Sequence, residues 1–253
     1  MIPNPEQTMV RDMARDFAAR ELAPHAAEWD RTGEPPLDVY RQMGELGLMG
    51  VCVPEEWGGA GADYVSYALA LEEIAAGCGA VSSVMSVNNS PVAAAILASG
   101  SDDQKDRFLR PLAKGKTIAA FCLTEPTTGS DASAIKTRAR KVGNRYIVNG
   151  AKQFITSGSI ADIAMIIAVT DEDAGKHGIS AFLTPTDAPG YRVVRRERKL
   201  GQNASDLCQL AFEDLELTPD LLLGEEGDGL RIALANLSLG RIGIGAQATG
   251  MAR

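Results

Sequence analysis

The 253-residue sequence has few of the residues that build metal sites and disulfide frameworks. It contains two histidines and four cysteines, and Cys52, Cys78, Cys122 and Cys208 are far apart and lack metal-ligand spacing. Scattered cysteines are typical of reduced thiols in a cytoplasmic protein. We therefore expect no metal site and a cytoplasmic location.

Positive charge and long apolar runs are also scarce. There are 25 Lys and Arg against 33 Asp and Glu, which gives a net charge of −8. This acidic balance argues against nucleic acid or an anionic membrane as a partner. We expect no run as long as a membrane span, and the first residues lack the apolar core of a secretory signal. Apolar residues (45%) still suffice for a sizeable core.

The hydrophobic pattern divides the chain into three parts, and the fold class that it predicts is α+β. Residues 1–116 predict an all-α N-terminal domain, with helices at about 6–29, 37–46, 63–76, 81–98 and 102–113. Residues 117–224 carry short apolar runs separated by Gly-Asn, Asn-Gly and Pro-Gly turns, which predicts an antiparallel β-sandwich or barrel. Its strands are expected at 118–120, 145–148, 163–169, 179–183, 191–194 and 207–212.

Residues 225–253 predict a helix that is apolar almost all round. Leu230, Leu234 and Leu237 form one stripe, and Ile232 and Leu239 belong to another. A helix of this kind is normally buried on every side. We therefore expect further structure to cover it.

The segment FCLTEPTTGSD, residues 121–131, is the first candidate site. It follows the apolar run 118–120 and breaks at Pro126 and Gly129 into an irregular loop. The loop carries four hydroxyls and no cation, which suits a large, weakly charged ligand such as a flavin ring or a thioester. Thirty residues on, Phe154-Ile155-Thr156 in NGAKQFITSG repeats the pattern of apolar wall plus hydroxyl. The alternative is that the hydroxyls only cap backbone groups.

These two segments resemble the flavin-binding segments of the acyl-CoA dehydrogenase family. Typical forms there are [LV]-T-E-P-x-x-G-S-D and N-G-x-K-x-[WF]-I-T-[NS], and both stand here in the family's order and near its separation. The resemblance implies FAD as cofactor. No G-x-G-x-x-G fingerprint follows a predicted strand, so a Rossmann site is not expected. By resemblance, the cofactor-binding residues are Phe121, Cys122, Leu123, Thr124, Gly129, Ser130, Phe154, Ile155 and Thr156.

The resemblance also implies a substrate site. Ser130 would contact the CoA portion of the substrate as well as the cofactor. Ser238-Leu239-Gly240-Arg241 is similar to the family's D-x-x-R segment, with Ser238 where aspartate is common, so Ser238 and Arg241 are candidate substrate-binding residues. A structural salt bridge is the alternative for Arg241, since a buried charge needs a partner.

No catalytic base is evident in the 253 residues. In most of the family the catalytic glutamate lies in the terminal helical bundle, beyond the position of Arg253. A minority carries it just before the arginine, where this sequence has Gly240. Glu125 lies in the flavin loop, but its Glu-Pro context indicates a structural role.

The function that the resemblance implies is FAD-dependent α,β-desaturation of a short-chain, straight or branched, acyl-CoA in fatty acid β-oxidation. Electrons would pass to an electron-transfer flavoprotein, and a homo-oligomer, dimer or tetramer, is expected. An acyl-CoA oxidase would share the fold. The chain resembles the first two domains of the family and the first helix of a C-terminal four-helix bundle. The alternative is therefore a non-catalytic module, truncated or partner-dependent, that binds flavin or acyl-CoA.

Overall fold

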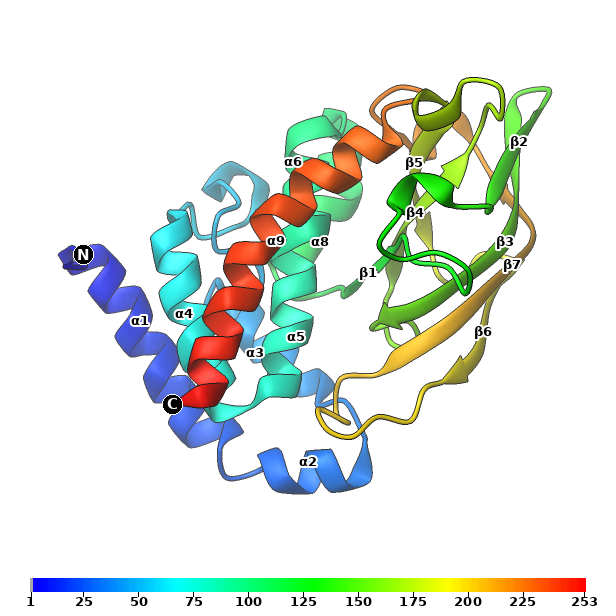
Figure 1. Cartoon of the computed structure of the whole chain (residues 1–253). Coiled ribbons are helices and arrows are strands. Elements are labelled where there is room, and N and C mark those ends of the chain that lie inside the picture. Colours follow the sequence, from blue (N-terminus) through cyan, green and yellow to red (C-terminus); the bar gives the residue numbers. More distant parts are fainter. Residues whose placement is uncertain (1) are drawn as a thin grey trace.

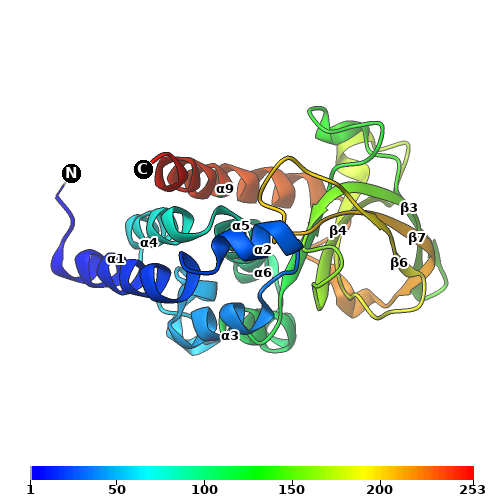
Figure 2. The same ribbon diagram turned by 90° about the horizontal axis from the view of Figure 1, so that it is seen from below.

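The structure, a computed structural model, describes residues 2–253, so Met1, the first residue of the predicted helical domain, lies outside the described part. Helices occupy one side of the molecule and a sheet the other, with β1 between them (Figure 1). The long C-terminal helix α9 runs back along the helical side, and both views place it beside α4 and α5 (Figure 2). The predicted α+β class is confirmed.

The helical part covers residues 5–113. Asp63 caps α4, because its carboxylate accepts a hydrogen bond from the Ser66 amide. The α-helices are α1 (Pro5–Phe17), α2 (Ala26–Thr32), α3 (Leu37–Glu45), α4 (Tyr64–Gly77), α5 (Gly79–Val87), α6 (Ala94–Ser99), α7 (Asp102–Gln104) and α8 (Arg110–Ala113). Short π-helical turns at Ala18–Leu22, Asn88–Ala93 and Lys105–Leu109 extend α1 and link α5 to α6 and α7 to α8, and 3-10 turns lie at Leu48–Gly50 and Glu55–Trp57.

Two predicted helices are interrupted. The first ends at Leu22 and resumes as α2 at Ala26, on either side of Pro24, which lacks the amide needed to continue a helix. The fourth is broken at Ser90, whose backbone is extended (φ −151°, ψ 122°) because it precedes Pro91. Residues 51–53, between α3 and α4, form a turn.

The stretch Gly79–Ser99 corrects a further expectation. By length and composition it is apolar enough to cross a membrane. Of the 18-residue window within it that meets this criterion, 78% is buried inside the protein. Its apolar character therefore fits the interior of the helical domain, where α5 packs against α4 and α9.

The sheet contains every predicted strand and two that the pattern did not predict, β2 and β8. The strands are β1 (Ala119–Cys122), β2 (Arg138–Val142), β3 (Arg145–Thr156), β4 (Ile163–Val169), β5 (Ile179–Pro185), β6 (Tyr191–Arg196), β7 (Leu207–Leu217) and β8 (Leu222–Leu223). Their order is β6-β7-β3-β2-β4-β5-β8, with β1 paired to β4. Most pairs are antiparallel, but β1 runs parallel to β4, and β2 is parallel to β4 at one pair. β2, Arg-Ala-Arg-Lys-Val, buries only Ala139, so its sequence gives little strand signal.

Two hydrophobic cores hold these parts together. The larger lies between the sheet and α6, α8 and the start of α9, and the smaller lies among α1, α3, α4 and α5. The sheet therefore packs directly on helices of the first part.

Three short 3-10 turns, at Ala132–Ala134, Gly175–Gly178 and Pro219–Leu221, lie in the connections between the strands of the sheet.

The last helix, α9 (Gly229–Ala252), packs through its small and polar residues. A side chain at Gly250 would begin 2.0 Å from the Glu72 carbonyl oxygen, so only glycine permits this approach of α9 to α4. Leu234 and Ile244 are instead 48% and 56% exposed. The glycine-containing face makes the contact with α4, and no residue between 2 and 253 fully covers Leu234 or Ile244, which fits the expectation of further structure over this helix.

Candidate functional site

The structure brings the two predicted segments into direct contact. The Gln153 amide in β3 donates a hydrogen bond of 2.8 Å to the Thr124 carbonyl oxygen in the loop after β1. The Lys152 ammonium donates to the preceding carbonyl, that of Leu123, at 2.9 Å. Two consecutive residues of β3 thus hold two consecutive carbonyls of the loop.

β3 is irregular where it meets this loop. Its register with β7 shifts between Lys152 and Ile155. Within this register shift, Phe154 has a backbone φ of 58° and is 58% exposed to solvent. A left-handed backbone at a bulky residue costs about 1–3 kcal/mol and is found mostly at functional sites. An exposed aromatic ring on such a backbone is the apolar wall that the sequence predicts for a flat ligand.

Three of the predicted ligand hydroxyls have no internal partner. The hydroxyls of Thr124, Ser130 and Thr156 make no hydrogen bond with any residue between 2 and 253. The Thr128 hydroxyl does, since it donates to the Asp131 carbonyl. The capping alternative therefore describes Thr128, and the other three hydroxyls are available to a ligand.

The remaining cofactor candidates lie deeper. Cys122, Leu123 and Ile155 are buried in the core, Phe121 is half-buried, and Gly129 is exposed on the loop. Burial raises the pKa of the Cys122 thiol to about 12, so it is protonated and unreactive near neutral pH. Because their side chains fill the core, the three buried residues offer a ligand only their backbone groups.

Glu125 has the structural role that the sequence predicts. Its carboxylate accepts hydrogen bonds from the Lys136 amide (2.6 Å), the Thr137 amide (2.9 Å) and the Lys152 ammonium (2.9 Å). Burial alone would raise the pKa of Glu125, but the Lys152 charge and the backbone donors outweigh it and lower the pKa. A carboxylate ionised and bonded in this way is a poor proton acceptor.

The other two substrate candidates lie on α9. The Ser238 hydroxyl donates to the Leu234 carbonyl of its own helix. Arg241 is exposed and lines an open groove of about 460 Å³ between α4 and α9, together with Tyr64 and Leu69. It forms no ion pair with any carboxylate in residues 2–253. The expectation that Arg241 is buried and the salt-bridge alternative are therefore both wrong here.

Lys152 is the residue near this site that sequence reasoning missed. It is 0% exposed and forms the buried partner of Glu125. The available signal was the lysine of the N-G-x-K-x-[WF]-I-T-[NS] motif, which falls at position 152. No group of three or more His, Cys, Asp or Glu side chains in the described residues could hold a metal ion.

Fold and site together define a class of protein: a helical domain joined to a β domain whose loop and strand present unpaired hydroxyls and an exposed aromatic ring. Comparison with known families is specific. Residues 4–116 match the N-terminal domain of acyl-CoA dehydrogenases, and residues 120–215 match their middle domain. The chain belongs to the acyl-CoA dehydrogenase family.

Individual relatives agree. An acyl-CoA dehydrogenase of Bacillus subtilis is 48% identical over 98% of this chain, and the mitochondrial short-chain specific acyl-CoA dehydrogenase of Rattus norvegicus is 45% identical over 97%. The chain spans 65% and 60% of the length of these two relatives. It therefore corresponds to part of each of them.

Solved structures are similar over nearly the whole chain. Butyryl-CoA dehydrogenase from Megasphaera elsdenii is 38% identical, with a TM-score of 0.96 over 99% of this chain and 66% of its own. A chain from a structure concerned with the electron transferring flavoprotein of Acidaminococcus fermentans is 43% identical, with a TM-score of 0.97 over 99% and 66%. A glutaryl-CoA dehydrogenase from Mycobacterium smegmatis in complex with FADH2 is 35% identical, with a TM-score of 0.91 over 98% and 62%.

Proposed function

We propose that this protein is an FAD-dependent acyl-CoA dehydrogenase that desaturates a short-chain, straight or branched, acyl-CoA between its α and β carbons. The observation that carries the proposal is the contact between the Thr124 loop and β3, with unpaired hydroxyls on Thr124 and Thr156 beside the exposed Phe154 ring. The names of the short-chain and butyryl-CoA relatives support the substrate class.

The residues present fit a flavin. Bound FAD would supply the hydride acceptor that protein side chains lack. Thr124 and the backbone of residues 121–123 would donate to the polar edge of the ring, and Thr156 would donate on the other side. Phe154, with Ile155 behind it, would form the wall, and Gly129 and Ser130 would bind the extended part of the cofactor. Neutral donors of this kind stabilise negative charge that develops on a ring.

The substrate would be held by Ser130, Ser238 and Arg241. Arg241 is exposed and unpaired within the described residues, so its guanidinium is available to a polar group of an acyl-CoA. A base must remove the α proton, and Glu125 is already bonded by three donors. We propose that the base comes from beyond Arg253 of the protein.

The wider setting is part of the proposal. Electrons would pass to an electron-transfer flavoprotein, and the similarity to a chain from the Acidaminococcus fermentans flavoprotein structure supports this partner. We propose that the protein forms a homo-oligomer. We also propose a cytoplasmic location, in keeping with four cysteines that form no disulfide within residues 2–253. We also propose domain limits of 1–116, 117–224 and 225–253.

One experiment tests the central proposal. The purified protein should show a flavin absorption band, and butyryl-CoA should bleach that band. Thr156→Val, which keeps the shape and removes the hydroxyl, should weaken FAD binding several-fold, as expected for one lost hydrogen bond. Bound FAD that no acyl-CoA bleaches would favour the non-catalytic binding module. A protein that binds neither FAD nor acyl-CoA would contradict both.

A further inference from the structure

Lys152 is a charged side chain in a place where a charge is expensive. It is 0% exposed, and its ammonium contacts the Leu123 carbonyl oxygen and the Glu125 carboxylate, each at 2.9 Å. Apolar residues of similar volume are often as stable as a buried ion pair. Stability alone is therefore a weak explanation for this pair, and its geometry suggests another.

The Lys152–Glu125 pair joins the two ends of the loop that contains the candidate flavin-binding residues. Glu125 stands at the start of the loop, and its carboxylate accepts from the amides of Lys136 and Thr137 at the loop's end. Lys152 reaches the same carboxylate from β3, 27 residues along the chain. Three separate segments thus meet at one carboxylate, and the residues between them include Ser130.

Lys152 and its neighbour Gln153 also hold this loop next to Phe154, the predicted apolar wall for the flavin ring. Lys152 holds the Leu123 carbonyl through its side chain, and Gln153 holds the Thr124 carbonyl through its amide. Phe154, the next residue, has the left-handed backbone that turns its ring outward. The position of the loop and the irregularity of β3 therefore depend on the same three residues.

We propose that Lys152 is a positioning residue for the flavin: through Leu123 and Glu125 it fixes the spacing between the Thr124 loop and the Phe154–Thr156 segment. This inference rests on the proposed function, because the spacing matters only if a flavin lies there. The hydrogen bonds of Lys152 are directional, so they hold the loop at a defined distance from β3. An apolar side chain would fill the same space without fixing that distance.

The test compares two variants of the holoprotein that lose stability but differ in location. Lys152→Met keeps the length of the side chain and removes both bonds. Leu215→Ala opens the buried core of β7, which pairs with β3 at Val148, away from the loop. Urea unfolding establishes that both are folded and similarly destabilised. FAD affinity, the shape of the flavin band and the midpoint potential of the bound flavin are then measured at a temperature where both remain folded.

We expect Lys152→Met to weaken FAD binding by about 10–100-fold, because a displaced loop would lose one or two hydrogen bonds to the flavin. The flavin band and potential should shift as well. Leu215→Ala should leave the spectrum and potential of the wild type. Equal FAD affinity, band and potential in the two variants would overturn the inference. A wild type that binds FAD normally alongside that result leaves the proposed function standing, whereas a wild type without FAD rejects both.

A second variant keeps the inference testable if Lys152→Met does not fold. Glu125→Gln preserves the shape and one acceptor oxygen, but its amide group faces the Lys136 amide, to which the carboxylate oxygen was bonded. A several-fold weaker FAD affinity with a shifted flavin band is expected. Glu226→Gln, which removes an exposed carboxylate that pairs with Lys141, is the matched control and should change neither. An unchanged band in Glu125→Gln would contradict the inference.

Discussion

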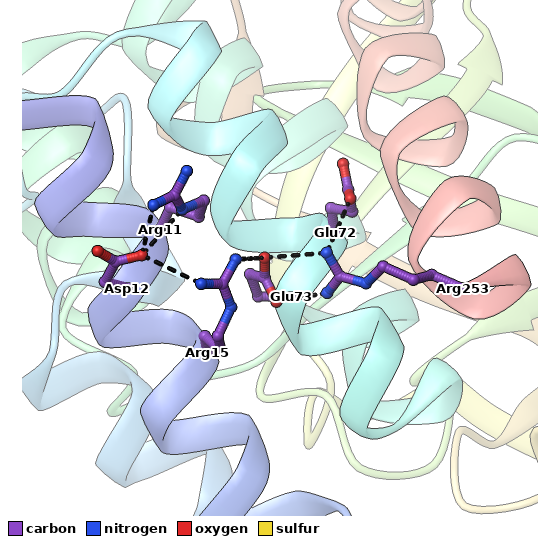
Figure 3. A network of polar contacts seen from close by, with 6 residues as sticks. All are labelled: Arg11, Asp12, Arg15, Glu72, Glu73 and Arg253. Carbon is purple, nitrogen blue, oxygen red and sulfur yellow. Dashed lines mark hydrogen bonds and ion pairs between the residues drawn. The ribbon is translucent and has the colours of Figure 1, made fainter. Parts of the chain in front are cut away.

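Two buried glutamates, one in each domain, solve the same electrostatic problem in different ways. The side chains of Glu73 in α4 and Glu125 after β1 are each 3% exposed. Glu73 lies between Arg15 from α1, at 2.7 Å, and Arg253 from the end of α9 (Figure 3). Glu125 has a single cation, Lys152, which is itself fully buried.

The difference lies in how each site meets solvent. Arg15 and Arg253 are 49% and 45% exposed, and Asp12 and Glu72 pair with them in turn (Figure 3). If one arginine is removed from this network, Glu73 still has the other arginine, and water can reach the site. Glu125 has no second cation, and its partner Lys152 is not exposed to water. The solvent-exposed network around Glu73 thus links α1, α4 and α9. The buried Glu125–Lys152 pair instead fixes the position of the loop after β1 relative to β3, beside the candidate site.

The largest effect is expected from Lys152→Met. Removal of one partner from a buried pair leaves an uncompensated charge and costs about 3–5 kcal/mol of folding free energy. Urea unfolding measures it. Lys141→Met, at a lysine that is 56% exposed, is the control and should lose far less. Similar losses in the two variants would show that the Glu125 site has solvent access after all.

Glu73→Gln should have a smaller effect. The amide keeps the shape but loses charge-assisted hydrogen bonds from two arginines, and bonds to charged groups contribute about 1.5–3 kcal/mol. Because both arginines are about half exposed, water can solvate them once the carboxylate is gone. Thermal unfolding beside Lys152→Met gives the ranking, and a loss equal to or above that of Lys152→Met would remove the contrast between open and closed sites.

Acid should weaken the Glu73 network. Burial alone would raise the pKa of Glu73, but Arg15 and Arg253 outweigh it, so the folded pKa lies below its ordinary value. A depressed pKa gives stability that is fully present above the unfolded value of about 4.3 and is lost as pH falls through the folded value. The stability gap between wild type and Glu73→Gln should therefore narrow below about pH 4.3. A gap that widens in acid would contradict the pKa direction.

The smallest effects should come from single arginines. Arg15→Ala or Arg253→Ala leaves Glu73 with the other arginine, so each should cost less than Glu73→Gln. The double variant leaves no arginine on Glu73 and should cost more than the sum of the two, since residues that share a partner are not additive. A double-mutant cycle measures this coupling, and simple additivity would mean that the arginines do not substitute for each other.

Local pattern predicted the loop and the strand that carry the candidate site, but not the long-range contacts around them. The loop and strand motifs identify Thr124 and Thr156 because their side chains stand at strand ends, which a local pattern can show. Lys152 and Glu125 are 27 residues apart, and nothing local indicates that their side chains meet. Arg241 lies four residues after Leu237, in line with the predicted apolar stripe, yet the packed face of its helix is the one with Gly243 and Gly250.

The sequence by itself determined the α+β class, the order of helices and strands, and the family to which the chain belongs, because periodicity and motifs are properties of neighbouring residues. Only the tertiary structure decided which face of α9 packs, which hydroxyls remain unpaired, and how a buried lysine closes the candidate loop. These depend on contacts between residues distant in the chain, where close approach and the need to compensate buried charge select the arrangement.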